Sequence, residues 1–215
     1  MGKKIIKTIK EIISGVLDII YPPYNKCIAC DTEEFIGICP LCKSKIKRVE
    51  NQDNTILSYG YYGGVLKKLI LSFKYDKNFT SGNILSELLI ELIYKEKLEF
   101  DIICYVPMTK LAIRKRGFNQ CEIICKNLSE ALGIPLSRSL IKTKDTKEQK
   151  SLSKEERAKN IEGVFKVRGN DILNKRILLI DDVVTTGSTL LECKKVLEKY
   201  TIEKITVLTI AKSHI

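Results

Sequence analysis

The sequence predicts an α/β fold, an open parallel sheet flanked by helices, with a small cysteine-rich module ahead of it. From about residue 55 onward, apolar strand-like segments alternate with helical segments, which is typical of a parallel sheet covered on both faces. A continuous apolar run at 177–180 then leads through two carboxylates and a hydroxyl-rich turn into a helix. In addition, two Cys-x-x-Cys pairs lie close together between residues 27 and 42.

The first predicted element is an amphipathic helix over residues 3–20, with isoleucines at helical spacing and four lysines in its first half. Two placements fit it, a membrane surface or the protein itself, and we favour the protein because Pro22 and Pro23 end the helix directly before the cysteine pairs. Beyond it we expect strands at 56–62, 73–75, 102–106, 140–141, 164–167, 176–180 and 205–210. We expect helices around 66–70 and at 82–96, 119–131, 153–160 and 188–199, and a mobile charged loop over 142–154.

Composition sets outer limits on function. The 215 residues are 44% hydrophobic, so the chain can bury a sizeable core, and we expect an N-terminal helix and zinc-binding module over residues 1–50 and a second domain over 51–215. No apolar stretch approaches the roughly 20 residues that span a bilayer, so we expect no integral membrane segment. No signal-peptide cleavage pattern follows the first helix, so we expect a cytoplasmic protein. The formal net charge of +11 reflects either a lysine-biased genome or an anionic partner, such as pyrophosphate or nucleic acid.

Four cysteines form two knuckles, Cys27 with Cys30 and Cys39 with Cys42. Four thiolates are the number that a tetrahedral structural Zn²⁺ site requires, and such a site has no open position for a catalytic water. A redox role would need one exposed Cys-x-x-Cys at the start of a helix, so we favour structural zinc. The remaining cysteines lie in apolar or helical surroundings and are expected to be small buried side chains rather than disulfide partners: Cys104, Cys121, Cys125 and Cys193.

The run at 177–190 has the order of residues that a sugar-phosphate site needs. Asp181 and Asp182 follow the apolar strand, and a helix is expected to begin near Ser188. Helix N-termini bind phosphate through their N–H groups, whereas carboxylates accept hydrogen bonds from sugar hydroxyls or bind Mg²⁺. The alternative is an ordinary strand-to-helix turn of a doubly wound α/β domain. The run contains neither a Walker A nor a G-x-G-x-x-G pattern.

Two further motifs accompany this run. The stretches V-P-M-T-K at 106–110 and R-K-R-G-F-N-Q at 114–120 follow a predicted strand, and we expect the basic segment to be a loop. Its basic side chains should therefore lie at the same sheet edge as the acidic pair. The other motif reads Q-x-x-L-x(4)-R-x-x-N-x-x-G-x-F from Gln149 to Phe165. Alone, D-D-V-V-T-T-G-S-T at 181–189 resembles the phosphoribosyl pyrophosphate (PRPP) signature of type I phosphoribosyltransferases. Together with the cysteine pairs, the three motifs resemble the ComF family, bacterial competence-associated proteins that join a Cys₄ zinc module to a type I phosphoribosyltransferase domain.

This resemblance implies a role for each matching residue. Asp181 and Asp182 would be the catalytic pair that binds the ribose, directly or through Mg²⁺. The pyrophosphate would contact Lys110, Arg114 and Arg116. A flexible loop carrying Lys144, Gln149 and Arg157 would close over the site and keep water away from the oxocarbenium-like centre. The loop that binds PRPP, mainly through its 5′-phosphate, would consist of Val183, Thr185, Thr186, Gly187, Ser188 and Thr189.

The resemblance also implies a phosphoribosyltransferase-fold protein that binds PRPP and Mg²⁺ and acts in DNA uptake, with single-stranded DNA and other competence proteins as candidate partners. Two alternatives stay open: a non-catalytic zinc-containing adaptor for nucleic acid or protein with a ligand-sensing PRPP site, and a base-salvage phosphoribosyltransferase. Thr185 stands where purine-salvage relatives place a general-base aspartate, so the acceptor is either already nucleophilic or absent. Lys142 and Lys144 stand where many relatives have arginine.

Overall fold

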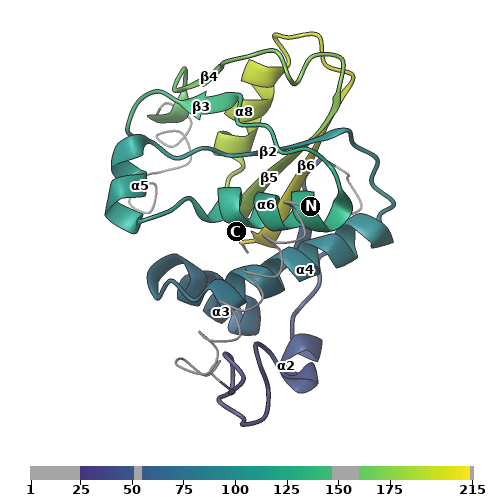
Figure 1. The fold of residues 1–215 in the computed structure, drawn as a ribbon, viewed down its shortest axis with the longest axis vertical. Coiled ribbons are helices and arrows are strands. Elements are labelled where there is room, and N and C mark those ends of the chain that lie inside the picture. Colours follow the sequence, from purple (N-terminus) through teal and green to yellow (C-terminus); the bar gives the residue numbers. More distant parts are fainter. Residues whose placement is uncertain (1–24, 51–54, 147–159, 214–215) are drawn as a thin grey trace, which may run out of the picture.

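A four-stranded parallel sheet forms the centre of the computed structural model, which describes residues 25–50, 55–146 and 160–213 (Figure 1). The strands lie in the order β1 (Leu57–Tyr61), β6 (Lys204–Lys212), β5 (Arg176–Val184) and β2 (Ile102–Tyr105). All three pairings between neighbours are parallel. Parallel neighbours need crossover connections, and helices supply them here, which confirms the predicted α/β class.

Both faces of the sheet are buried, because successive side chains of a strand point to opposite faces. On β5, Leu178 and Ile180 belong to the core formed with α3 (Gly64–Tyr75), α4 (Phe79–Lys95) and α6 (Gln120–Leu132). Ile177 and Leu179 belong to a second core, formed with α8 (Ser188–Leu197). An antiparallel pair, β3 (Leu140–Lys142) and β4 (Phe165–Val167), contributes to the second core. The uninterrupted apolar run at 177–180 therefore reflects burial on two faces.

The cysteine-rich module lies against α3 and α4 and contains one short helix, α2 (Pro40–Ser44) (Figure 1). Lys68 on α3 donates a hydrogen bond to the carbonyl oxygen of Ala29 at 2.7 Å, and Lys43 forms an ion pair with Glu91 on α4. Three of the four knuckle cysteines belong to the same apolar core as α3 and α4. The module is therefore held on the sheet domain by a shared core.

The prediction of a strand at 73–75 is wrong, because these residues form the last turn of α3. Phe73 continues the helical spacing of Leu66, Leu69 and Ile70 and is buried with them. Packing of this apolar stripe overrides the β preference of the aromatic residues. Helix α4 also begins earlier than predicted, because the side chain of Asn78 caps it by accepting a hydrogen bond from the Ser81 N–H at 3.0 Å.

The basic segment after β2, expected to be a loop, forms the short helix α5 (Lys110–Arg116). The Thr109 hydroxyl caps its start by accepting from the Ala112 N–H at 3.2 Å, and Gly117 ends it with a φ of 97°, a conformation that favours glycine. Strand β5 also runs past its predicted end at 180, because β6 is long enough to pair with it up to Lys212.

The remaining predicted elements between 56 and 210 are found within a few residues of their expected positions where the structure describes them. The predicted helix at 3–20, nearly all of the helix at 153–160 and the loop beyond residue 146 lie outside the described residues. Among helices of the described ranges, none combines the length and the hydropathy that crossing a bilayer requires.

Candidate functional site

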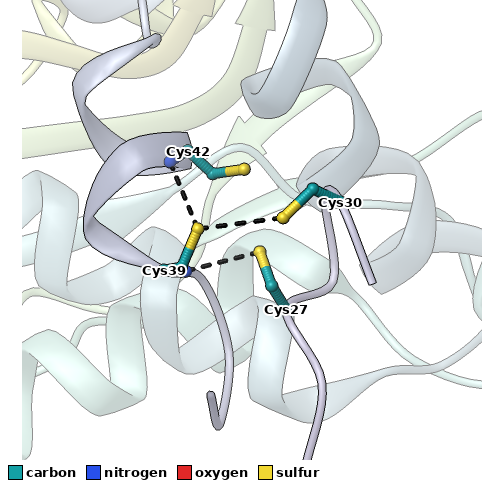
Figure 2. A group of neighbouring side chains, drawn as sticks. All are labelled: Cys27, Cys30, Cys39 and Cys42. Atoms are coloured by element: carbon teal, nitrogen blue, oxygen red, sulfur yellow. Dashed lines mark hydrogen bonds between the residues drawn. The ribbon is translucent and has the colours of Figure 1, made fainter. Parts of the chain in front are cut away.

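The four knuckle cysteines converge, and their sulfur atoms all lie within 4.8 Å of one another (Figure 2). The Sγ atoms of Cys30 and Cys39 are 3.8 Å apart. A tetrahedron with Zn–S bonds of about 2.3 Å has S–S edges of about 3.8 Å, so the cluster has the dimensions of a zinc site. Backbone N–H groups of Cys39 and Cys42 point at the sulfurs of Cys27 and Cys39, at 3.3 and 3.4 Å. The four thiols therefore fit the predicted Zn²⁺.

The four thiols differ in their readiness to ionise. Cys30 is exposed, and its hydrogen bond with the Thr32 hydroxyl at 3.1 Å lowers the pKa of Cys30 to about 6. Burial, with neighbouring sulfurs, raises the pKa of Cys42 to about 12. The sulfurs are too close for all four to carry charge unless a cation balances them, which is what a bound divalent metal does.

A cavity of about 380 Å³ lies at the carboxyl edge of the sheet and is lined by the part of the predicted sugar-phosphate run that begins at Asp181. One wall of the cavity comes from β5, the turn after it and the start of α8, residues 181–190. The facing wall comes from α3 and the ends of β1 and β6, through Tyr62, Leu71, Lys74, Tyr75 and Ser213. The pairing of β2 with β5 ends at Ile180, and in the described part of the chain no strand pairs with the last part of β5 on that side. There Gln120, at the start of α6, contacts the acidic pair.

The turn after β5 is built to start a helix at the cavity. Gly187 precedes α8 with a φ of 77°, a conformation that favours glycine, and its carbonyl oxygen accepts from the Leu191 N–H at 2.9 Å. The hydroxyls of Thr186 and Ser188 are 2.9 Å apart, and the Ser188 N–H points at Thr186 Oγ1 at 3.4 Å. The N–H groups and the positive end of the α8 dipole therefore lie beside hydroxyl donors.

The two carboxylates of the acidic pair have opposite electrostatic surroundings. Burial, followed by the neighbouring charge of Asp182, raises the pKa of Asp181 to about 7. Burial alone would also raise the pKa of Asp182, but the ammonium of Lys74, 2.7 Å from Asp182 Oδ2, lowers it, assisted by the side-chain amide of Gln120. At neutral pH Asp182 is thus the permanently charged member, and Asp181 is the member near its titration point.

The motif R-G-F-N-Q at 116–120 holds this arrangement in place. Gln120 donates to Asp182 Oδ2 through Nε2 at 2.6 Å and accepts from Arg116 Nη1 at 2.6 Å. The Asn119 side chain caps α6 by accepting from the Cys121 N–H at 3.0 Å. Phe118 packs against Phe73, with ring centroids 5.1 Å apart. The motif therefore links α5, α6 and α3 to the acidic pair.

The other predicted basic residues lie at different distances from the cavity. Arg116 is linked to Asp182 by hydrogen bonds through Gln120, and its charge also helps to lower the pKa of Asp182. Lys110 lines a second cavity of about 280 Å³ between β2, α6 and β3. Arg114 is exposed on α5, and Lys144 is exposed beyond β3. Gln149 and Arg157 lie outside the described residues. The assignment of these residues to pyrophosphate and to a closing loop stays a prediction.

Three side chains at the acidic pair were missed by sequence reasoning. Lys74 was hidden in a segment predicted as a strand, and only its place in the last turn of α3 brings it to the cavity. Gln120 belongs to a motif that was recognised for its arginines. Cys121, correctly predicted to be buried, donates to Asp181 Oδ1 through its thiol at 3.5 Å. The helical spacing from Leu66 to Phe73 was the signal that could have placed Lys74 in a helix, although not its contact with Asp182.

Comparison with known proteins agrees with the geometry. Residues 85–214 match a family described as phosphoribosyl transferase domain. The chain is 32% identical over 180 residues to Competence protein F of Haemophilus influenzae, which covers 80% of this chain and 78% of that protein. It is 31% identical over 142 residues to the DNA utilization protein YhgH of Escherichia coli, covering 63% of this chain and 62% of the relative.

Competence protein ComFC of Streptococcus pneumoniae is 30% identical over 138 residues, or 64% of this chain and 59% of the relative. The matched region thus spans less than two thirds of the length of the YhgH and ComFC relatives and more than three quarters of Competence protein F. Both the domain match and the identity to Competence protein F cover most of the described sheet domain. The chain therefore belongs to the ComF family and carries a phosphoribosyl transferase domain.

Proposed function

We propose that this protein binds PRPP with Mg²⁺ in the cavity at the carboxyl edge of the sheet, and that it acts in DNA uptake or processing. The observation that carries the proposal is the composition of this one cavity of about 380 Å³. It combines two carboxylates, a hydroxyl-rich turn and a helix N-terminus, which suit the ribose hydroxyls and the 5′-phosphate of one ligand. Its volume lies in the range of cavities that take small ligands.

The chain's own groups have distinct tasks in the proposed complex. The N–H groups at the start of α8 and the hydroxyls of Thr186 and Ser188 donate to the 5′-phosphate, while Asp181 and Asp182 accept from the ribose hydroxyls. The carboxylate oxygens are also hard donors that would hold Mg²⁺, which supplies charge neutralisation for the pyrophosphate group when bound. In a transfer reaction the bond from ribose C1 to pyrophosphate breaks, pyrophosphate leaves with the electron pair, and the acceptor bonds to C1.

The four-cysteine cluster is proposed to hold structural Zn²⁺ on Cys27, Cys30, Cys39 and Cys42. Its support is the sulfur spacing and the complete set of four thiols, which leaves no open coordination position. The module also shares its core with α3, the helix that carries Lys74 to the cavity. Zinc would thus support the PRPP site by stabilising the module that packs against α3, and it would take no part in the reaction.

Single-stranded DNA is the proposed macromolecular partner, and the names of the relatives refer to competence and DNA utilization. A surface beside the cavity favours it, because the aromatic residues Tyr75 and Phe79 are 56% and 51% exposed next to the cationic helix α5. The guanidinium of Arg116 lies 5.8 Å from the Tyr75 ring centroid. Exposed rings beside cations are what unstacked bases and a phosphate backbone require. The net charge of +11 acts in the same direction.

Calorimetric titration with PRPP and Mg²⁺ tests the central claim, using the wild type and the double variant Asp181→Ala with Asp182→Ala. Each hydrogen-bond acceptor lost from a buried site costs about 1–3 kcal/mol, so the double variant should bind at least about 30-fold more weakly. Circular dichroism must show that the variant is folded. Equal affinity in the two proteins would remove the assignment of the acidic pair.

Pyrophosphate release, measured with PRPP and candidate acceptors, then separates the remaining functions. Release with a free nucleobase supports the salvage alternative, and release with another acceptor supports a transferase of different specificity. Binding of PRPP without release in any combination supports the ligand-sensing adaptor.

A further inference from the structure

Lys74 is an unusual lysine because it lines the cavity and is largely buried rather than lying at the surface. It extends from the last turn of α3, its side chain is 16% exposed, and its ammonium is 2.7 Å from Asp182 Oδ2. Burial would lower the pKa of Lys74, but the Asp182 carboxylate raises it, so the side chain stays charged. No motif of the sequence assigned it a role.

The cavity needs this charge for its proposed ligand. PRPP carries phosphate groups at both ends of the ribose, and the carboxylates that line the cavity repel them. In the proposed complex the α8 N-terminus is already taken by the 5′-phosphate. Among the residues that line the cavity in the described part of the chain, Lys74 is the sole lysine or arginine.

The contacts of Asp182 show which partner can leave. Its Oδ2 atom already accepts from both Lys74 and the Gln120 amide, at 2.7 and 2.6 Å, so a ribose hydroxyl that binds this oxygen competes with them. Gln120 is fixed by its place at the start of α6 and by its bond from Arg116. Lys74, in contrast, ends a flexible four-carbon side chain whose ammonium can turn to a new acceptor.

We infer that Lys74 is a pyrophosphate-binding residue and that it is paired with Asp182 until the ligand binds. When the ribose hydroxyls occupy Asp182, the released ammonium turns to the pyrophosphate oxygens of the same PRPP molecule. The ion pair of the free protein is thereby exchanged for two ligand contacts, one to the ribose and one to the pyrophosphate. This inference rests on the proposed PRPP site and adds to it the residue that recognises the leaving group.

The test compares two ligands that differ only in the group concerned, PRPP and ribose 5-phosphate. Lys74→Met removes the charge and keeps the apolar stem, and Lys77→Met, at an exposed position just after α3, is the control with the same charge change. A hydrogen bond to a charged group contributes about 1.5–3 kcal/mol, so Lys74→Met should weaken PRPP by about 10- to 100-fold. Affinity for ribose 5-phosphate should stay equal or rise, and Lys77→Met should leave both affinities within about threefold.

A purely structural counter-ion would behave differently, since its loss would change the affinity for both ligands alike. An equal change, or no change, for PRPP and ribose 5-phosphate overturns the inference. Lys74→Gln, which can still donate to Asp182, gives the same comparison if Lys74→Met does not fold. If the wild type itself fails to bind PRPP, the proposed function fails. If it binds and the two ligands respond equally, only the role of Lys74 fails.

Discussion

Replacing Asp181 with asparagine should stabilise the protein, and the gain should grow with pH. In the folded protein, burial and the charge of Asp182 raise the pKa of Asp181 from 3.8 to about 7. The folded carboxyl therefore keeps its proton where the unfolded one has lost it. Its contribution to stability is complete below about pH 3.8 and is lost as the pH rises through about 7. At about 1.4 kcal/mol per pH unit, the loss between pH 5 and pH 8 is about 3 kcal/mol.

Asparagine removes the charge and keeps the Oδ1 acceptor that receives the Asp182 N–H at 2.8 Å. Urea unfolding of the variant and the wild type at pH 5 and pH 8 gives the free energy difference between them at each pH. Subtracting the unfolding free energies of the two proteins cancels the titration of groups that do not interact with Asp181, such as Cys30. Asp182, whose pKa is lowered, stays ionised throughout this range and adds no slope. The difference should be about 3 kcal/mol larger at pH 8.

The control for this prediction is Asp76→Asn, which changes an exposed acid that follows α3. It shows how large a pH effect the loss of one exposed carboxylate has by itself. If the difference between Asp181→Asn and the wild type is independent of pH, the acidic pair does not store electrostatic repulsion and the reasoning is refuted. The predicted gain in stability of Asp181→Asn would show that the acidic pair destabilises the folded protein, as is common for residues that serve ligand binding.

Two further predictions concern the metal and the nucleic acid. Elemental analysis should find one Zn²⁺ per chain, and Cys39→Ser should lose the metal and unfold at lower urea concentration. A purified wild type that is fully folded without metal, and whose Cys39→Ser variant is equally stable, would contradict the site. Single-stranded DNA should bind with a log–log salt slope near −3 if about four phosphates are neutralised, using about 0.7 per phosphate, and fluorescence anisotropy measures it. Tyr75→Ala should weaken DNA binding about 5- to 150-fold through lost stacking, whereas Tyr94→Ala, which removes a ring that is 67% exposed on α4, should not. Absence of binding at about 50 mM salt would exclude DNA as a direct partner.

Local patterns in the sequence predicted the structure correctly where the residues of a segment favour a single conformation or a single kind of site. The apolar run at 177–180 could only be a strand buried on two faces, and the order of carboxylates, hydroxyls and glycine after it was read correctly as the start of a helix. The four cysteines likewise indicated one cluster, because two knuckles have no other common use at this spacing. The expectation that their sulfurs converge is confirmed, while the zinc itself stays a prediction.

Segments with mixed signals needed the tertiary structure. Phe73–Tyr75 carries β-favouring aromatic residues, yet the helical stripe before it packs into the core and prolongs α3. The segment 110–116 is rich in charge and gave no apolar periodicity, so its helix depends on the Thr109 cap and on Gly117. Neither feature outweighs the loop pattern until the neighbouring elements are in place.

The sequence by itself determined the class of the fold, the cysteine cluster and the position of the acidic pair, since each depends on residues that are close together in the chain. Only the tertiary structure decided what surrounds that pair. Lys74 and Gln120 are 108 and 62 residues away from Asp182, and α3 and α6 bring them within 3 Å of it. Such contacts arise from the packing of helices on a sheet, which couples distant segments through burial, and no local spacing in the chain encodes them.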